Sequence, residues 1–421
     1  MKRAYSKKYK KAKRLAILWL TLFAACLLLA FNGYFIANFL PQPAMAEVLM
    51  PDNQASGSAP FAPFLNIVPD PDGTQLYIEA GGVGELGGTL FVNIDEGPSH
   101  DKISYAMTYS DTVQAYVTTA TGLTPATDSS HTLSITSTLG LNSGEVVFYR
   151  AFVPQATTSR TIHSDDGLLA LSILNSGTFT TDAYLVVVPS FAPPGNLPLD
   201  HSFVGAAYSV RASGAVVESE RPFTLQLSYT NSQLAGTDPH TLAIFAWDGA
   251  RQQWGNLGGT LFDNQQFFSR NTSRFTSYAL IATPTWHDDF NGFSGIDFDQ
   301  SHNITLGSSQ TIILQDPTQP GQLVSQPISG VGQWDTLDFN SIALAPTATL
   351  TVDILAADGT LLLANVVPNT NLAALINASQ HPTLRLRANL ASQDGTTSPA
   401  LAGWSLSWRT YRQYLPLVRK E

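Results

Sequence analysis

Four aspartates in the last third of the chain have the residue type and spacing of a metal site. Asp288 and Asp289 are adjacent, and Asp297 and Asp299 are separated by one residue. Because positions i and i+2 share a face of a β-strand, Asp297 and Asp299 would present their carboxylates side by side. Carboxylate oxygens are hard donors that suit calcium. The pattern predicts either a calcium ion bound by these four aspartates or a solvated turn before a strand.

Nucleophilic catalysis finds no support in the sequence. The segment Gly292-Phe293-Ser294-Gly295 lacks the Gly-x-Ser-x-Gly spacing of a nucleophile elbow. The eight histidines are scattered and form neither His-x-His nor His-Glu-x-x-His. We therefore expect no enzyme active site. A triad assembled from distant residues stays open, as does an enzyme within residues 61–200.

Three tryptophans could form a platform for sugar rings, since aromatic faces pack well against apolar ligand faces. Trp404 and Trp408 share one face of an expected strand with Leu406, and serines occupy the other face, which is typical of a core strand. Trp334 has polar neighbours, Gln333 and Asp335. Trp334 is therefore the candidate ligand-binding residue.

Charge is distributed unevenly along the chain. The first fourteen residues hold eight of the 22 lysines and arginines, and no acidic residue precedes Glu47. From Glu47 onward, 14 basic residues face 32 acidic ones. Such a surface repels phosphate backbones, so we expect no nucleic-acid partner.

The N-terminus has the order of features of a secretory signal peptide: basic residues 1–14, apolar residues 15–30, two prolines and then Ala44-Met45-Ala46. The alternative is an uncleaved membrane anchor, because Leu15–Leu40 is uncharged and long enough to span a bilayer. Either reading predicts an extracellular or cell-surface protein. Any membrane contact would be made by this N-terminal helix alone.

Beyond residue 60, apolar residues alternate with polar ones at period two, which indicates β-strands. Clear examples are Thr224–Tyr229, Thr349–Ile354 and Thr383–Arg387, and the continuous apolar run Leu185–Val188 is typical of a central strand. We predict an all-β chain of tandem β-sandwich domains after an N-terminal signal or transmembrane helix.

Two segments rich in turn residues, Ser190–Asp200 and Thr283–Phe290, suggest domain boundaries. The predicted order is a signal peptide or membrane anchor (1–46), a linker (47–60), a β-sandwich of unrecognised family (61–200), two further β-sandwiches (201–284 and 285–410) and a C-terminal tail (411–421).

The middle unit contains the strand Arg221–Tyr229, the pair Leu242–Asp248 and Trp254–Thr260, and a closing Phe275–Leu280. The Asp248-Gly249 turn signal places Trp247 and Trp254 on opposite arms of one hairpin. Together these segments resemble the small ZU5-like β-sandwich of bacterial secreted and surface proteins. The resemblance covers about 80 residues and implies an architectural or interaction module without catalytic residues.

The segment Thr397–Trp408 is similar to the last strand of galactose-binding-like jelly rolls, and the tail Tyr414–Arg419 resembles the ending of secreted multidomain surface proteins of filamentous Chloroflexota. The tail resemblance implies export. Our leading hypothesis is a non-enzymatic secreted or cell-surface protein with structural or adhesive modules, whose expected partners are glycans or cell-envelope components. The alternative is a carbohydrate-binding protein acting through residues 285–410, with calcium as a stabilising ion.

Overall fold

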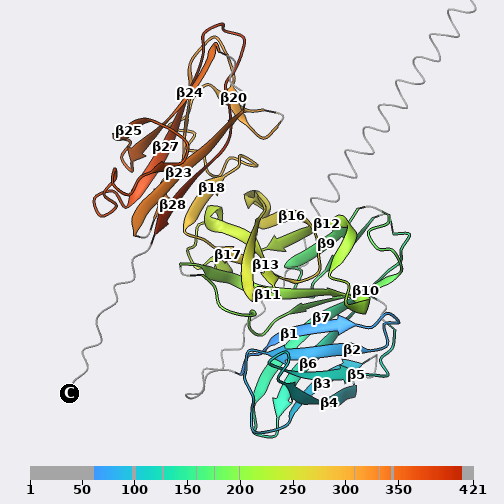
Figure 1. Cartoon of the computed structure of the whole chain (residues 1–421). Coiled ribbons are helices and arrows are strands. Elements are labelled where there is room, and N and C mark those ends of the chain that lie inside the picture. The colour runs from blue at the N-terminus through green and yellow to red at the C-terminus, as the bar shows by residue number, and fades with distance from the viewer. Residues whose placement is uncertain are drawn as a thin grey trace, which may run out of the picture. The chain divides into compact units, whose positions relative to one another are not determined.

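Strands make up nearly all the regular structure, as the period-two alternation predicts (Figure 1). The computed structural model describes residues 61–96, 101–125, 128–157, 159–174, 176–198, 200–307, 309–330, 332–342 and 346–409, which belong to one compact unit, Ser58–Glu421. The predicted signal peptide or anchor, the linker and the tail lie outside these residues. Within them, no helix combines the length and apolar character that crossing a bilayer requires.

The largest sheet has 12 strands, and its pairings are antiparallel. In spatial order it consists of β1 (Phe64–Pro69), β2 (Leu76–Gly81), β5 (Ala115–Ala120), β4 (Asp101–Ser110), β3 (Leu90–Glu96), β6 (Ser129–Ser137), β7 (Asn142–Val153), β10 (Ala183–Pro189), β11 (Ser202–Ala212), β17 (Ser277–Ala282), β13 (Leu242–Asp248) and β14 (Gln253–Gly258).

A second, five-stranded sheet shares a hydrophobic core with the 12-stranded sheet. Its strands, in spatial order, are β15 (Thr260–Phe262), β16 (Phe267–Arg274), β12 (Glu218–Ser228), β9 (Leu169–Ile173) and β8 (Arg160–His163). Short helical segments connect the strands of this region: η1 (Ser213–Ala215), α2 (Asn231–Leu234), η2 (Pro239–Thr241) and η3 (Asp263–Gln265).

Strand β10 explains why Leu185–Val188 is apolar without interruption. Val186 and Val188 pack into a core with strands β1 to β7, while Leu185 and Val187 pack into the core beneath the five-stranded sheet. Because successive side chains of a strand point to opposite faces, a strand between two cores is apolar on both. The expectation of a central strand is confirmed.

The boundary expected near residue 200 does not separate two cores. Strand β10 pairs with β11, strand β9 pairs with β12, and one core contains residues from Ala151 to Ala282. The proline-rich segment 190–200 is therefore a connection within one sheet, and residues 201–284 take pairing partners from residues 169–189.

The hairpin predicted from Asp248-Gly249 is confirmed. Trp247 on β13 pairs with Trp254 on β14, and their ring centroids lie 5.6 Å apart. The Trp254 indole is buried and its Nε1 donates to the backbone carbonyl of Pro194 at 2.8 Å.

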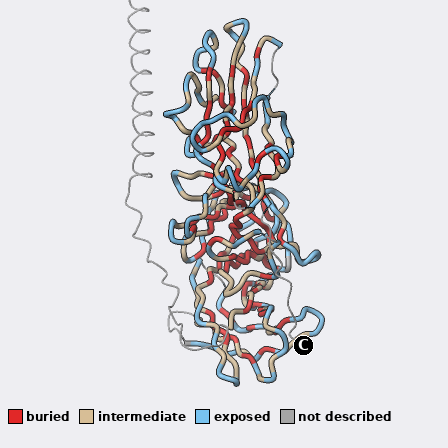
Figure 2. The backbone as a smooth tube through the Cα atoms, turned by 90° about the vertical axis from the view of Figure 1, so that its left-hand side faces the viewer, coloured by how far each residue is buried: buried red, intermediate tan, exposed pale blue. Residues whose placement is uncertain are grey.

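The strands after Pro284 form two further sheets around their own core. One contains β19 (Ile304–Leu306), β20 (Ile312–Leu314), β28 (Ala400–Arg409), β23 (Gln333–Ile342) and β26 (Thr370–Asn371), with β18 (Thr285–Asp288) paired to β28. The other contains β21 (Gly321–Val324), β27 (Thr383–Ser392), β24 (Ala348–Ala356) and β25 (Leu361–Val366), with β22 (Ile328–Ser329) paired to β27. Figure 2 shows the buried residues concentrated in the interior and the exposed residues at the outer bends of the chain.

Candidate functional site

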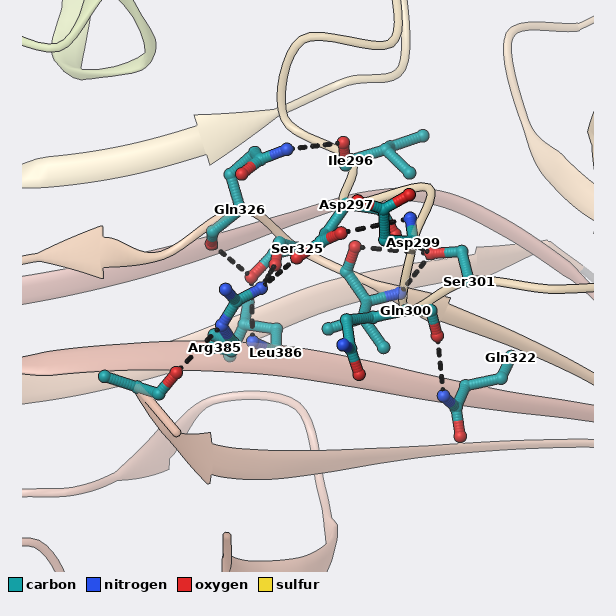
Figure 3. Close-up of polar contacts among 12 residues, drawn as sticks. Ile296, Asp297, Asp299, Gln300, Ser301, Gln322, Ser325, Gln326, Arg385 and Leu386 are labelled. Carbon is teal, nitrogen blue, oxygen red and sulfur yellow. Dashed lines mark hydrogen bonds and ion pairs between the residues drawn. The ribbon is translucent and has the colours of Figure 1, made fainter. Parts of the chain in front are cut away.

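Asp297 belongs to a turn that is fixed to the neighbouring sheet (Figure 3). Its Oδ1 accepts a hydrogen bond from the backbone N–H of Asp299 at 3.1 Å, and its Oδ2 accepts from the Arg385 guanidinium. Both side chains of this ion pair are largely buried, at 15% exposure for Asp297 and 16% for Arg385. The Asp297 carboxylate is therefore engaged on both oxygens by protein donors.

Other contacts hold the same turn against β21 and β27. Ser301 Oγ donates to the Asp297 carbonyl at 2.7 Å and accepts from the Val324 N–H at 2.9 Å. Arg385 also donates to the carbonyl of Ser325 at 3.1 Å. Asp299 is exposed to solvent. These contacts give Asp297 a structural role in the folded chain.

Asp288 lies apart from that turn, at the end of β18, and is 7% exposed. Its Oδ1 accepts from the Phe290 N–H at 2.9 Å, whereas its Oδ2 is buried without a partner. Burial raises the pKa of Asp288 to about 6, because the charged form loses hydration. A Cβ on Gly295 would lie 2.1 Å from Asp288 Oδ2, so a larger residue at position 295 would displace the Asp288 carboxyl group.

A small hollow that opens to solvent lies beside Asp288. Asn291 also lines it and carries a second buried side-chain oxygen without a partner. The lining residues come from both sides of Pro284: His240, Leu261, Asp263, His287, Asp288, Asp289, Asn291, Gly292 and Ser294.

His240 connects the two sides of the hollow. Its Nδ1 lies 3.0 Å from Asp238 Oδ1, and its Nε2 lies 3.2 Å from Ser294 Oγ. Burial alone would lower the pKa of His240, but the hydrogen bond and the charge of Asp238 outweigh burial and raise it. Burial lowers the pKa of the neighbouring His287.

The backbone after β18 is held in an unusual conformation. Phe290 is fully buried and has a φ of 56°, in the left-handed region that costs free energy for a residue with a side chain. The Asp288–Phe290 hydrogen bond and the burial of the Phe290 ring stabilise this turn. After this turn the chain reverses direction, and the Ser294 hydroxyl lies within hydrogen-bond distance of His240 Nε2.

Two exposed aromatic rings contact each other in the segment that follows Asn291. Phe293 is 47% exposed and Phe298 is 57% exposed, and their centroids lie 5.4 Å apart in an edge-to-face arrangement. Phe293 stands between Gly292 and Ser294, which both line the hollow. We call Phe293 and Phe298 the aromatic pair.

The structure divides the four aspartates predicted to bind calcium. Asp288 and Asp289 line the hollow, whereas Asp297 is paired with Arg385 and Asp299 follows it in the exposed turn. In the described part of the chain, no group of three or more His, Cys, Asp or Glu side chains is placed to hold a metal ion. Calcium binding stays a prediction.

Trp334 does not offer a face to a ligand, so its prediction as a binding residue is corrected. The residue is 1% exposed, its Nε1 donates to the His381 carbonyl at 2.8 Å, and its ring packs edge-to-face on Trp408. The polar neighbours that suggested exposure occupy alternate positions on the other face of β23. The expectation that Trp404 and Trp408 are core residues is confirmed by their burial.

The sequence did not point to Asp238, His240, Ser294 or the aromatic pair. Asp238-Pro239-His240 has a weak local signal, since an aspartate before proline and histidine can cap a short helical turn. Nothing in the sequence connects Ser294 with His240, because 54 residues separate them.

No family model matches the chain, and no curated protein matches it. Among solved structures, it has 12% identity to an isomalto-dextranase of Arthrobacter globiformis T6 complexed with panose, with a TM-score of 0.20, covering 61% of this chain and 40% of that one. It has 9% identity to a family 43 arabinoxylan arabinofuranohydrolase of Bacillus subtilis in complex with cellotetraose, with a TM-score of 0.20, covering 83% and 96%. The chain thus spans less than half of the isomalto-dextranase. At these TM-scores neither similarity bears on function.

Proposed function

We propose that the chain is an extracellular or cell-surface β protein with a structural and adhesive role, and that it adheres by binding carbohydrate at the hollow and the aromatic pair. The observation that carries this proposal is a pair of exposed phenylalanine rings in contact, one of which lies between Gly292 and Ser294, two residues of a hollow lined with hydrogen-bonding side chains. Sugar rings present both apolar C–H faces and hydroxyl groups, so a binding site needs both kinds of partner.

The residues of the hollow match that requirement. Asp263 and Asp289 carry carboxylate acceptors that are partly exposed, and Ser294 carries an exposed hydroxyl. Asn291 has a buried side-chain oxygen without a partner. A few convergent polar groups beside an apolar surface are typical of small-ligand sites.

The acidic surface supports a neutral ligand over an anionic one. Carboxylates from Asp263, Asp288 and Asp289 surround the hollow, and they would repel a phosphorylated or sulfated glycan. We therefore infer a neutral polysaccharide of the cell envelope or of another cell as the partner.

The proposed location rests on the N-terminal sequence, which lies outside the described residues. The mature chain is expected to begin near Glu47 after cleavage. N-terminal sequencing of material from the producing cells tests this, and a membrane-bound product that retains Met1 would favour the anchor.

The test of carbohydrate binding is a glycan array probed with the full chain in mild detergent. We expect signal on one class of neutral glycans and none on phosphorylated or sulfated forms of the same sugars. An array without signal, or one with signal mainly on anionic glycans, would contradict the proposal.

A further inference from the structure

Asp238, His240 and Ser294 form a continuous hydrogen-bonded array at the hollow. Asp238 Oδ1 accepts from both the backbone N–H and the ring Nδ1 of His240, at 2.9 and 3.0 Å. Because an ionised carboxylate only accepts, Nδ1 carries the proton when His240 is neutral. Nε2 is then left as the acceptor for the Ser294 hydroxyl, 3.2 Å away.

The array has the arrangement of an activated serine. Ser294 is exposed, whereas His240 is 7% exposed and stacks on the Trp286 ring at 5.5 Å. The base is thus fixed in orientation while the nucleophile is open to solvent. A nucleophile beside a base that a third group orients is the requirement for nucleophilic catalysis.

We propose that Ser294 is an acyl-transfer nucleophile, activated by His240 and oriented by Asp238, that cleaves small acyl esters of neutral or polyhydroxylated alcohols. This activity goes beyond carbohydrate binding, and it revises the expectation that the chain holds no enzyme active site. The acidic lining of the hollow excludes anionic esters for the reason given above.

The step balances with water as the only co-reactant. The Ser294 proton passes to His240 Nε2 as Oγ bonds to the acyl carbon, and the same proton then passes to the departing alcohol as its C–O bond breaks. Water next gives a proton to His240 while its oxygen bonds to the acyl carbon, and Ser294 recovers the proton as it leaves. An ester and a water molecule thus become an acid and an alcohol.

Negative charge around the hollow favours the protonated histidine that forms in both steps. Asp238 contacts His240 directly, and the carboxylates of Asp288 and Asp263 lie close enough to stabilise its positive charge. Asn291 carries a side-chain amide N–H, the type of donor that stabilises a tetrahedral oxyanion.

The test uses the full chain and a neutral fluorophosphonate probe, which bonds to an activated serine with loss of fluoride. We expect one adduct, on Ser294 by peptide mass spectrometry, and none on Ser294 in the S294A variant. His240→Gln should slow labelling by at least about 100-fold. The labelling rate should rise with pH, with a midpoint above the ordinary histidine value of 6.5.

Two results would overturn the proposal: no adduct on folded wild-type chain after hours with excess probe, or equal labelling of wild type and a folded His240→Gln variant. If that variant does not fold, Asp238→Asn replaces it, since the Asp238 side chain is 43% exposed. Hydrolysis of p-nitrophenyl acetate, expected in wild type and absent in Ser294→Ala, is the second readout. Neither the fluorophosphonate nor p-nitrophenyl acetate contains a sugar. Their failure to react would therefore not count against carbohydrate binding, which the glycan array tests separately.

Discussion

The imidazole of His240 stacks on the indole of Trp286, with 28° between their ring planes. His240 belongs to η2 and Trp286 to β18, on either side of the short connection Thr283-Pro284. The connection itself is hydrogen-bonded to both sides, since Thr283 N–H donates to the Thr241 carbonyl and Trp408 N–H to the Pro284 carbonyl. The hollow is therefore built from residues that precede and follow the expected boundary near residue 284.

Trp334→Ala should lower the free energy of unfolding by about 3–5 kcal/mol, because it removes a fully buried indole and leaves a cavity. Denaturant unfolding of the full chain measures this. Phe298→Ala, at an exposed ring, is the matched control and should change stability by no more than about 0.5 kcal/mol. Equal stability of wild type and Trp334→Ala would show that the indole is not in the core.

Asp288 should make stability fall as pH rises. Its pKa is about 6 in the folded chain against an ordinary value of 3.8, so the folded state binds this proton more tightly. The resulting stabilisation is complete below about pH 4 and is lost as pH passes 6, up to about 3 kcal/mol. His240, whose pKa is also raised, acts in the same direction, and His287, whose pKa is lowered, acts in the opposite one.

The measurement is the unfolding free energy of wild type and Asp288→Asn at several pH values. The difference between them should change between pH 4 and pH 8, with Asp288→Asn gaining relative stability at the higher pH. A difference that does not vary with pH would mean that Asp288 ionises in the folded chain as it does in water.

Asp297 should stabilise the fold through Arg385 without contributing to calcium binding. Asp297→Ala leaves Arg385 without its carboxylate partner, and we expect the free energy of unfolding to fall by roughly 2–3 kcal/mol.

Any rise in melting temperature with calcium should persist in Asp297→Ala and disappear in Asp289→Asn. Calcium at a hundredfold excess over its Kd would add about 2.7 kcal/mol. Melting curves in millimolar calcium and in excess EDTA measure the calcium effect in each variant. Loss of that effect in Asp297→Ala would contradict the prediction that Asp297 is not a calcium ligand.

A fragment of residues 201–284 should not fold alone, because β11 and β12 would lose β10 and β9 as pairing partners and leave part of a core exposed. A fragment of residues 61–284 retains those strands. Circular dichroism and amide dispersion in NMR spectra distinguish the two. A cooperative unfolding transition in the shorter fragment would support the boundary that the sequence suggested.

The fold class was predictable because alternation is a local property of the sequence. Leu225 and Leu227 are buried and the residue between them, Gln226, is partly exposed, as their spacing indicates. The division near residue 200 was wrong because prolines indicate a turn but do not determine whether the next strand pairs with the same sheet. Strand β10, apolar on both faces, was the local sign that two cores meet there.

The candidate site was less predictable than the fold. Asp288 and Asp289 were identified from residue type alone, and both line the hollow. Asp297 was assigned to the same site from strand spacing, but the segment forms a turn whose carboxylate meets Arg385, a partner 88 residues away. Long-range pairs of this kind, like that of His240 and Ser294, depend on the tertiary fold.

The affinity of the full chain for its glycan, measured with variants of the aromatic pair, tests the proposed function most directly. Phe293→Ala and Phe298→Ala should each weaken binding at least about tenfold, because each removes one exposed ring of the aromatic pair. Leu375→Ala, at another exposed apolar side chain (55% exposed), is the matched control and should bind as wild type does. Unchanged affinity in both phenylalanine variants would show that carbohydrate is not bound at this site.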